Sequence, residues 1–164
     1  MNSNTLTPLY KSSNRSQTWM VIDDIVMGGV SQSSVSYSKE GYTKFKGNVS
    51  TAYNGGFSSM RLRFKTVNIK DAQTVVLRIK GDGKRYQFRL KEQWRDAYSF
   101  IHYFETNSNW QTIEIPLKEV NASYRGRMLR NILFSNSTLE EIGILIGNKT
   151  NEPFELLIDT IYLK

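Results

Sequence analysis

The chain has 164 residues, of which 39% are hydrophobic, and it carries a formal net charge of +7. This length is typical of one domain, and a domain of this size buries roughly 68–70% of its unfolded surface. The hydrophobic content argues against disorder. Because the sequence contains no cysteine, disulfides and thiolate metal sites are excluded.

The beginning of the chain shows no targeting pattern. Residues 1–17 are mostly polar and lack the apolar core of a signal peptide, and Arg15 is their only arginine. No run of about 18 apolar residues predicts a membrane span. We therefore expect a cytoplasmic protein, with residues 1–15 loosely held and residues 16–164 forming a single β-sandwich domain.

Two glycine-rich blocks are the first features in chain order. The first, residues 23–31, reads Asp-Asp-Ile-Val-Met-Gly-Gly-Val-Ser, and the second, residues 54–59, reads Asn-Gly-Gly-Phe-Ser-Ser. Paired glycines let the backbone take positive φ or approach another group closely. The small polar residues beside them either build a loop-borne site or only shape tight turns. We expect both blocks to meet at one end of the fold.

Alternation of apolar and polar residues with a period of two predicts strands along most of the chain. Met60, Leu62 and Phe64, for example, alternate with basic residues, so the strand has one buried face. Helix is scarce: we expect at most a turn at 137–140, and a short helix or an irregular connection at 128–135. Many short strands separated by turns indicate an all-β sandwich or jelly roll. The predicted strands are 33–38, 43–50, 60–65, 75–80, 86–91, 98–106, 111–117, 142–147 and 154–163.

Asp82-Gly83 is a strong signal for a two-residue hairpin turn. The predicted hairpin places Lys80 opposite Arg85, and like charges across a strand pair destabilise it. A bound anion or nucleic acid would relieve the repulsion, but a solvated face is the usual state of such residues. Because no nucleic-acid motif accompanies the face, we do not expect a nucleic-acid partner. The predicted basic face contains Arg78, Lys80, Arg85 and Arg89.

No catalytic constellation is visible. His102 is the only histidine, so a typical zinc site is not expected, and no Gly-x-Ser-x-Gly elbow marks a serine nucleophile. Asp23, Asp24 and Asp82 would suit calcium through their oxygens, or the capping and turn bonds usual for aspartate. They match no recognised calcium loop. We therefore expect no enzyme, no cofactor and no metal.

Arg125-Gly126-Arg127 places two guanidinium groups around a glycine. This arrangement suits a bidentate grip on a carboxylate or phosphate. It also suits an intramolecular ion pair with Asp23 or Asp24, which is the interpretation we favour. Met27 and Phe57 either form an apolar wall beside the glycines or pack in the core.

One set of motifs spans the chain from residue 19 to its end: Trp19, Asp23-Asp24, Val26–Ser31, Gly55–Ser59 with Arg61, Gly81-Asp82-Gly83 with Tyr86, Trp110, Pro116, Arg125-Gly126-Arg127 and the strand 154–161. In these motifs the chain resembles the complex I intermediate-associated protein family, named for mitochondrial assembly factors of respiratory complex I. The resemblance implies a galactose-binding-like jelly roll and a non-enzymatic role in assembling a membrane oxidoreductase.

Three functions follow as hypotheses. The first is a non-catalytic binding or assembly protein with a protein partner, such as a subunit of a respiratory complex. The second is a module that binds a carbohydrate or another small ligand, and the third is binding of an anion or nucleic acid on the basic face. The candidate binding residues are Asp23, Asp24, Met27, Gly28, Gly29, Ser31, Asn54, Gly55, Gly56, Phe57, Arg61, Arg125 and Arg127.

Overall fold

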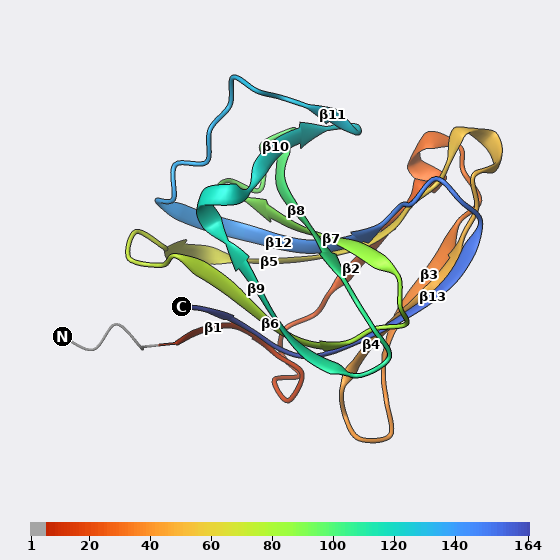
Figure 1. Cartoon of the computed structure of the whole chain (residues 1–164), viewed down its shortest axis with the longest axis horizontal. Coiled ribbons are helices and arrows are strands. Elements are labelled where there is room, and N and C mark those ends of the chain that lie inside the picture. Colours follow the sequence, from red (N-terminus) through yellow and green to blue (C-terminus); the bar gives the residue numbers. More distant parts are fainter. Residues whose placement is uncertain (1–5) are drawn as a thin grey trace.

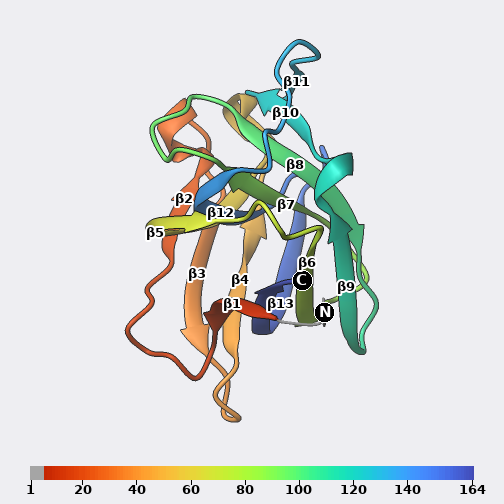
Figure 2. The same cartoon turned by 90° about the vertical axis from the view of Figure 1, so that its left-hand side faces the viewer.

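The protein folds into two antiparallel β-sheets that pack face to face (Figures 1 and 2). The structure is a computed structural model that describes residues 6–164, with the backbone only for Val26. The first sheet has the strand order β3-β4-β13-β6-β9, with β1 also paired to β13, and the second has the order β11-β10-β8-β7-β12-β5-β2. The all-β sandwich is therefore confirmed. The strands are β1 (Thr7–Lys11), β2 (Met20–Asp23), β3 (Gln32–Tyr37), β4 (Thr43–Val49), β5 (Ser58–Asn68), β6 (Thr74–Lys80), β7 (Arg85–Lys91), β8 (Ser99–Glu105), β9 (Trp110–Pro116), β10 (Asn121–Tyr124), β11 (Arg127–Met128), β12 (Thr138–Ile146) and β13 (Glu152–Leu163).

Helix is as scarce as the sequence predicts. Within residues 6–164 it is confined to single 3-10 turns, namely η1 (Asp24–Met27), η2 (Ala52–Asn54) and η3 (Leu117–Glu119). In this part of the chain no helix has the length and apolar character needed to cross a membrane. Residues 137–140, expected to form a turn, instead begin β12, whereas the connection after β11 is irregular as one alternative proposed.

The alternation along each strand places its apolar side chains between the sheets. Phe88 and Leu90 of β7 are fully buried, and so are Leu77 and Ile79 of β6 in the facing sheet. These side chains belong to one continuous core cluster. Because the apolar face of each strand packs in this core, the charged residues of the second sheet are left on its outer face.

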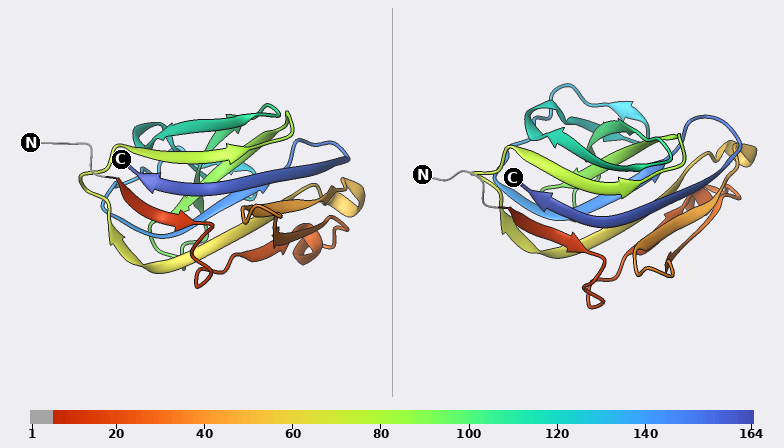
Figure 3. Two further views of the ribbon diagram at one scale, coloured as in Figure 1. Left: turned by 90° about the horizontal axis from the view of Figure 1, so that it is seen from below. Right: turned by 60° about the horizontal axis from the view of Figure 1, so that its bottom comes forward.

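The N-terminal strand β1 differs from the expectation that residues 1–15 are loosely held. Residues 1–5 lie outside the described part of the chain, but β1 pairs with the C-terminal strand β13, with Thr7 opposite Leu163 (Figure 3). Leu9 and Tyr10 are buried, and the Tyr10 hydroxyl bonds to that of Thr43. Burial of a large apolar side chain stabilises by roughly 1.5–3 kcal/mol, which explains why this segment is ordered.

The predicted hairpin at Asp82-Gly83 was wrong, because β6 and β7 belong to different sheets. The connection crosses from one sheet to the other. Asp82 bonds to a distant strand and to a nearby one: its Oδ2 accepts a hydrogen bond from the Glu155 amide of β13 at 2.8 Å, and its Oδ1 accepts one from the Tyr86 hydroxyl of β7 at 3.0 Å. A local turn signal thus describes the bend correctly but not which strands pair across it.

The basic face that depended on this hairpin does not exist. Arg78 and Lys80 lie on β6, whereas Arg85 and Arg89 lie on β7 in the other sheet. Lys80 pairs with Trp110 rather than with Arg85, and Arg85 pairs with Glu105. The expected like-charge opposition is therefore absent from this pair of strands, and the binding hypothesis built on it loses its surface.

Candidate functional site

The two glycine blocks meet in space, as expected, and the carboxylate of Asp24 joins them. Asp24 is 0% exposed. Within its own block it accepts hydrogen bonds from the Ser31 amide at 2.9 Å and the Ser31 hydroxyl at 2.6 Å. From the second block the amides of Gly56 and Phe57 donate to it at 2.6 and 3.3 Å. We call Asp24, Gly29, Ser31 and residues 55–57 the glycine junction.

Two glycines of this junction are required by their closeness to Asp24. A Cβ atom on Gly29 would lie 2.4 Å from the Asp24 Cγ, and one on Gly55 would lie 2.4 Å from Oδ2. Gly28 is required for a different reason, since its φ is +87° although a Cβ atom there would meet nothing within 4 Å. The paired glycines therefore have a structural explanation that needs no ligand.

The hydrogen bonds at the junction also favour the ionised form of Asp24. Burial by itself would raise the pKa of Asp24, but the bonds from Ser31, Gly56 and Phe57 outweigh burial and hold the pKa below its ordinary value of 3.8. The donors come from the chain itself, so this carboxylate acts as a link between two loops.

The other aspartates are also bonded internally. Asp23 accepts hydrogen bonds from the Ser33 hydroxyl at 2.6 Å and the Ser33 amide at 3.0 Å, and Asp82 lies on the β6–β7 connection described above. Among the described residues, no group of three or more His, Cys, Asp or Glu is placed to hold a metal ion. Neither Arg125 nor Arg127 forms an ion pair with these aspartates within residues 6–164.

A cleft of about 650 Å³ lies on the outer face of the second sheet. In Figure 1, β10 and β11 rise on one side of this face, and the loops with η1 and η2 rise at the right-hand end. Met27 and residues 54–57 line the cleft from the glycine-block end, and Tyr124, Arg125 and Met128 line it from the β10–β11 side. The glycine junction thus forms one wall of the cleft rather than its centre.

Strand register arranges the floor of this cleft in rows that run across the sheet. Directly opposed residues of neighbouring antiparallel strands point to the same face, so each row is made of one residue per strand. The three rows, starting nearest the glycine junction, are Ser59-Leu145-Gln87-Tyr103, Arg61-Gly143-Arg89-Ile101 and Arg63-Glu141-Lys91.

Positive charge collects on this floor. The cleft is lined by Arg61, Arg89, Lys91 and Arg125, and by no acidic residue of the described chain. Burial and, to a smaller extent, the neighbouring charge of Arg61 lower the pKa of Arg89 to about 10. Burial likewise lowers the pKa of Lys91. Arg89 remains charged at neutral pH, so the floor holds a cation that water solvates poorly.

Glu141 is the one carboxylate in the three rows described above. It is 3% exposed, and its Oε1 accepts a hydrogen bond from Arg63 Nε at 2.8 Å. Its charge raises the pKa of Arg89 and of Lys91 and so opposes the effect of burial. One carboxylate that is already bonded to Arg63 leaves the floor with a net positive charge.

A short polar chain fixes the direction of Arg89. Its Nη1 donates to Gln87 Oε1 at 2.7 Å, and Gln87 Nε2 donates to the Tyr103 hydroxyl at 3.2 Å. Tyr103 and Tyr124 both line the cleft and keep part of each ring exposed. The cleft therefore offers aromatic rings as well as guanidinium groups to a ligand.

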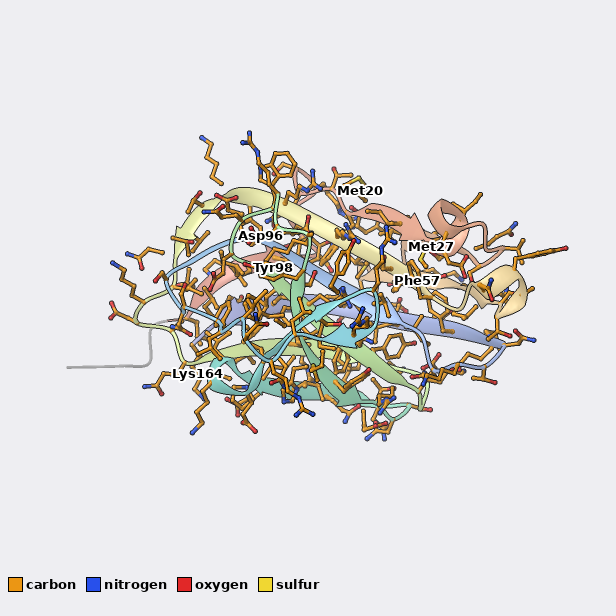
Figure 4. The ribbon with its side chains drawn as sticks, turned by 90° about the horizontal axis from the view of Figure 1, so that it is seen from above. Met20, Met27, Phe57, Asp96, Tyr98 and Lys164 are labelled. Atoms are coloured by element: carbon orange, nitrogen blue, oxygen red, sulfur yellow. The ribbon has the colours of Figure 1, made fainter. Side chains whose placement is uncertain are left out.

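Large apolar side chains are exposed on the loops beside the cleft. Ile25 is 71% exposed, Met27 51% and Tyr53 74%. Figure 4 looks onto this side of the molecule and shows Met27 next to Phe57, near the end with the two 3-10 turns. Exposed apolar side chains that gather near a cleft are typical of interaction sites.

The family model described as complex I intermediate-associated protein 30 (CIA30) matches residues 9–158, which is nearly the whole chain. The chain belongs to the CIA30 family. The resemblance seen in the glycine motifs is thereby confirmed.

Solved structures similar to this CIA30 chain include carbohydrate-binding modules. A family 11 module from Clostridium thermocellum, in complex with a β-1,3-1,4-mixed-linked tetrasaccharide, has 14% identity and a TM-score of 0.72, with 96% of this chain and 94% of that chain covered. The family 11 module of the cellulase Lic26A-Cel5E from the same organism has 15% identity and a TM-score of 0.74, with 97% and 94% covered. These likenesses confirm the galactose-binding-like jelly roll.

The structure of the CIA30 chain separates the candidate residues into two groups. Residues that line the cleft are Met27, Asn54, Gly55, Gly56, Phe57, Arg61 and Arg125. Outside its lining are Asp23, Asp24, Gly28, Gly29, Ser31 and Arg127. Sequence reasoning missed Arg89, Lys91, Tyr103 and Tyr124 as parts of a common cleft. Arg89, Lys91 and Tyr103 lie on the polar faces of their strands, but the signal that unites all four residues is strand order, which is not local.

Proposed function

We propose that this CIA30 chain is a non-catalytic binding protein that holds a segment of a partner protein in the cleft during assembly of a respiratory complex. The proposal rests on the exposed apolar side chains of Ile25, Met27 and Tyr53 beside an open cleft. Large apolar and aromatic residues with arginine are enriched in protein–protein interfaces. The description of the family as complex I intermediate-associated supports a partner of this kind. A cytoplasmic location stays a prediction.

The order of the loops beside the cleft also supports a role in binding a partner protein. The glycine junction fixes the loops that carry Met27 and Phe57 through four hydrogen bonds to Asp24. A surface that is already ordered loses less conformational freedom on binding, which favours affinity. Asp24, Gly29 and Ser31, which lie outside the cleft lining, would therefore shape the binding surface without touching the partner.

Arg125 and Arg127 provide a matched test. Both are exposed on the β10–β11 hairpin, Arg125 in its turn and Arg127 at the start of β11, but only Arg125 lines the cleft. Affinity capture from native lysate should enrich a subunit of a membrane oxidoreductase, identified by mass spectrometry. We expect Arg125→Ala combined with Met27→Ser to lose that subunit and Arg127→Ala to retain it. Identical captured proteins for all three forms would contradict the proposal.

A second candidate function is saccharide binding, favoured by the part-exposed rings of Tyr103 and Tyr124 beside polar side chains in the cleft. Ligands that bind only the folded state raise its stability by mass action. A thermal-shift survey across neutral glycans tests this function directly. A shift that disappears in Tyr103→Ala would support it, and an unchanged melting temperature across the survey would count against it.

A further inference from the structure

Arg61 and Arg89 stand on either side of Gly143 in the middle row of the floor. Gly143 pairs with Arg61 on β5 and with Arg89 on β7. Neighbouring strands are about 4.8 Å apart, so the two backbones are separated by roughly 10 Å. A Cβ on Gly143 would lie 3.6 Å from Arg61 Cγ and 3.7 Å from Arg89 Cβ. The nearest atom to that Cβ would be the Met60 carbonyl oxygen at 3.1 Å, and because residue 143 has no side chain, the gap between the two arginine stems contains no atom of β12 beyond its backbone.

Neither arginine has an anionic partner in the described chain. Across residues 6–164, no carboxylate oxygen comes within 4.0 Å of either guanidinium group. The one side-chain bond of Arg89 goes to the neutral amide of Gln87. Two like charges that share a partly buried floor repel each other, and an anion between them would remove that repulsion.

We propose that the gap above Gly143 is a seat for a carboxylate, and that the partner segment held in the cleft is acidic. This inference rests on the proposed function and names the chemistry of its partner. A carboxylate between two guanidinium groups accepts forked hydrogen bonds from each, the geometry that arginine provides and lysine does not. Lys91 in the next row and Arg125 at the rim extend the positive surface along the cleft.

A protein segment fits this surface better than an acidic polysaccharide. The cationic floor adjoins Met27 and Phe57 of the cleft wall, and Ile25 and Tyr53 are exposed on the same loops. A peptide can present a carboxylate to the floor and an apolar side chain to the loops at once, since successive side chains of an extended chain point in opposite directions. Saccharide chains carry no large apolar groups.

The test uses a fluorescein-labelled hexaglutamate peptide and fluorescence anisotropy at low salt. The comparison ligands are hexaglutamine and polygalacturonate. We expect the protein to prefer hexaglutamate to both, Arg61→Gln and Arg89→Gln to weaken binding about tenfold each, and the double variant to weaken it about 100-fold. Lys39→Gln/Lys44→Gln removes the same charge from the β3–β4 hairpin, away from the cleft, and should change affinity by less than about twofold.

Each other outcome would overturn the inference. No binding of hexaglutamate, an equal loss in the Lys39/Lys44 control, or a preference for polygalacturonate contradicts an acidic protein ligand at this seat. If the glutamine pair does not fold, Arg61→Lys/Arg89→Lys decides, because it keeps the charge but loses the forked donors and should weaken binding about tenfold. If the captured subunit is lost with the Arg125→Ala/Met27→Ser variant but kept with the glutamine pair, the proposed function stands and the acidic seat is wrong.

Discussion

The glycine junction and the cationic floor lie beside each other but use charge in opposite ways. At the junction, Asp24 is buried and accepts four hydrogen bonds from its own chain. On the floor, Arg61 and Arg89 have no carboxylate partner within the described residues. A charge that is satisfied internally stabilises the fold, whereas a charge left without a partner is available to a ligand. The difference separates the residues that build the cleft from those proposed to bind in it.

The largest expected effect is at the junction. Asp24→Ala leaves the amides of Gly56 and Ser31 without an acceptor, and each buried unsatisfied group costs about 1–3 kcal/mol. We expect the free energy of unfolding to fall by about 4 kcal/mol, measured by urea denaturation. Asp23→Ala, which removes only the bonds to Ser33, should cost about 1 kcal/mol. A smaller loss for Asp24→Ala than for Asp23→Ala would contradict the claim that the hydrogen bonds of Asp24 stabilise the fold.

The lowered pKa of Asp24 makes its contribution to the free energy of unfolding depend on pH. Because its folded pKa lies below the ordinary value of 3.8, its contribution to stability is complete above that pH and is lost as the pH falls through the lowered value. The difference in unfolding free energy between the wild type and Asp24→Asn should therefore be constant near neutral pH and shrink below pH 3.8. A difference that grows on acidification would contradict this assignment.

Gly28 and Gly29 test whether closeness to Asp24 is what requires glycine at the junction. Gly29→Ala places a methyl group against the Asp24 carboxylate and should cost about 3 kcal/mol. Gly28→Ala meets nothing within 4 Å, so only its left-handed backbone opposes the change, at about 1 kcal/mol. Chemical denaturation of the two variants measures both values. Equal losses would mean that closeness to Asp24 is not what selects glycine at position 29.

Glu141→Gln tests the row of the floor that lies farthest from the glycine junction. Loss of this nearly buried carboxylate removes the partner of Arg63 and the charge that offsets Lys91, and we expect a loss of about 2 kcal/mol in unfolding free energy. Because the floor becomes more positive, hexaglutamate should bind severalfold more tightly. A variant that is less stable and also binds less tightly would show that Glu141 orders the floor rather than balancing its charge.

The smallest stability effect is expected on the floor itself. Arg89→Gln removes a charge that burial disfavours, so the free energy of unfolding should change by less than about 0.5 kcal/mol. The same variant should lose about tenfold in affinity for hexaglutamate. A thermal melt compared with an anisotropy titration separates the two quantities. A large loss of stability would place Arg89 with Asp24 as a structural residue.

The sequence was sufficient to locate most of the strands but not to predict which strands pair with one another. Alternation located β5, β6 and β7 because burial of one face leaves a period of two in the chain. The motifs also predicted that the glycine blocks meet. The hairpin at Asp82-Gly83 failed because its partners, such as Glu155, come from a distant strand. The short strands β1, β2, β10 and β11 were missed, since a few residues carry too little alternation to be distinguished from a loop.

The candidate site, too, depends on strand pairing that local sequence patterns do not reveal. Arg61 was named because it belongs to a motif, whereas Arg89 was assigned to a basic face that does not form. Both lie in one row only because β12 runs between β5 and β7, and that strand comes from near the end of the chain. The aspartates stood out in the sequence because glycines surround them, and the structure uses them as internal acceptors.

The pairing of β1 with β13 determines how the molecule can be attached to anything else. Thr7 lies opposite Leu163, so the polypeptide enters and leaves on the same side. Figure 4 shows Lys164 at one end of the molecule and Met27 with Phe57 at the other. A linker, an affinity handle or a neighbouring domain joined there would lie at the end opposite the loops with Met27 and Phe57, and those loops would remain open to a large complex.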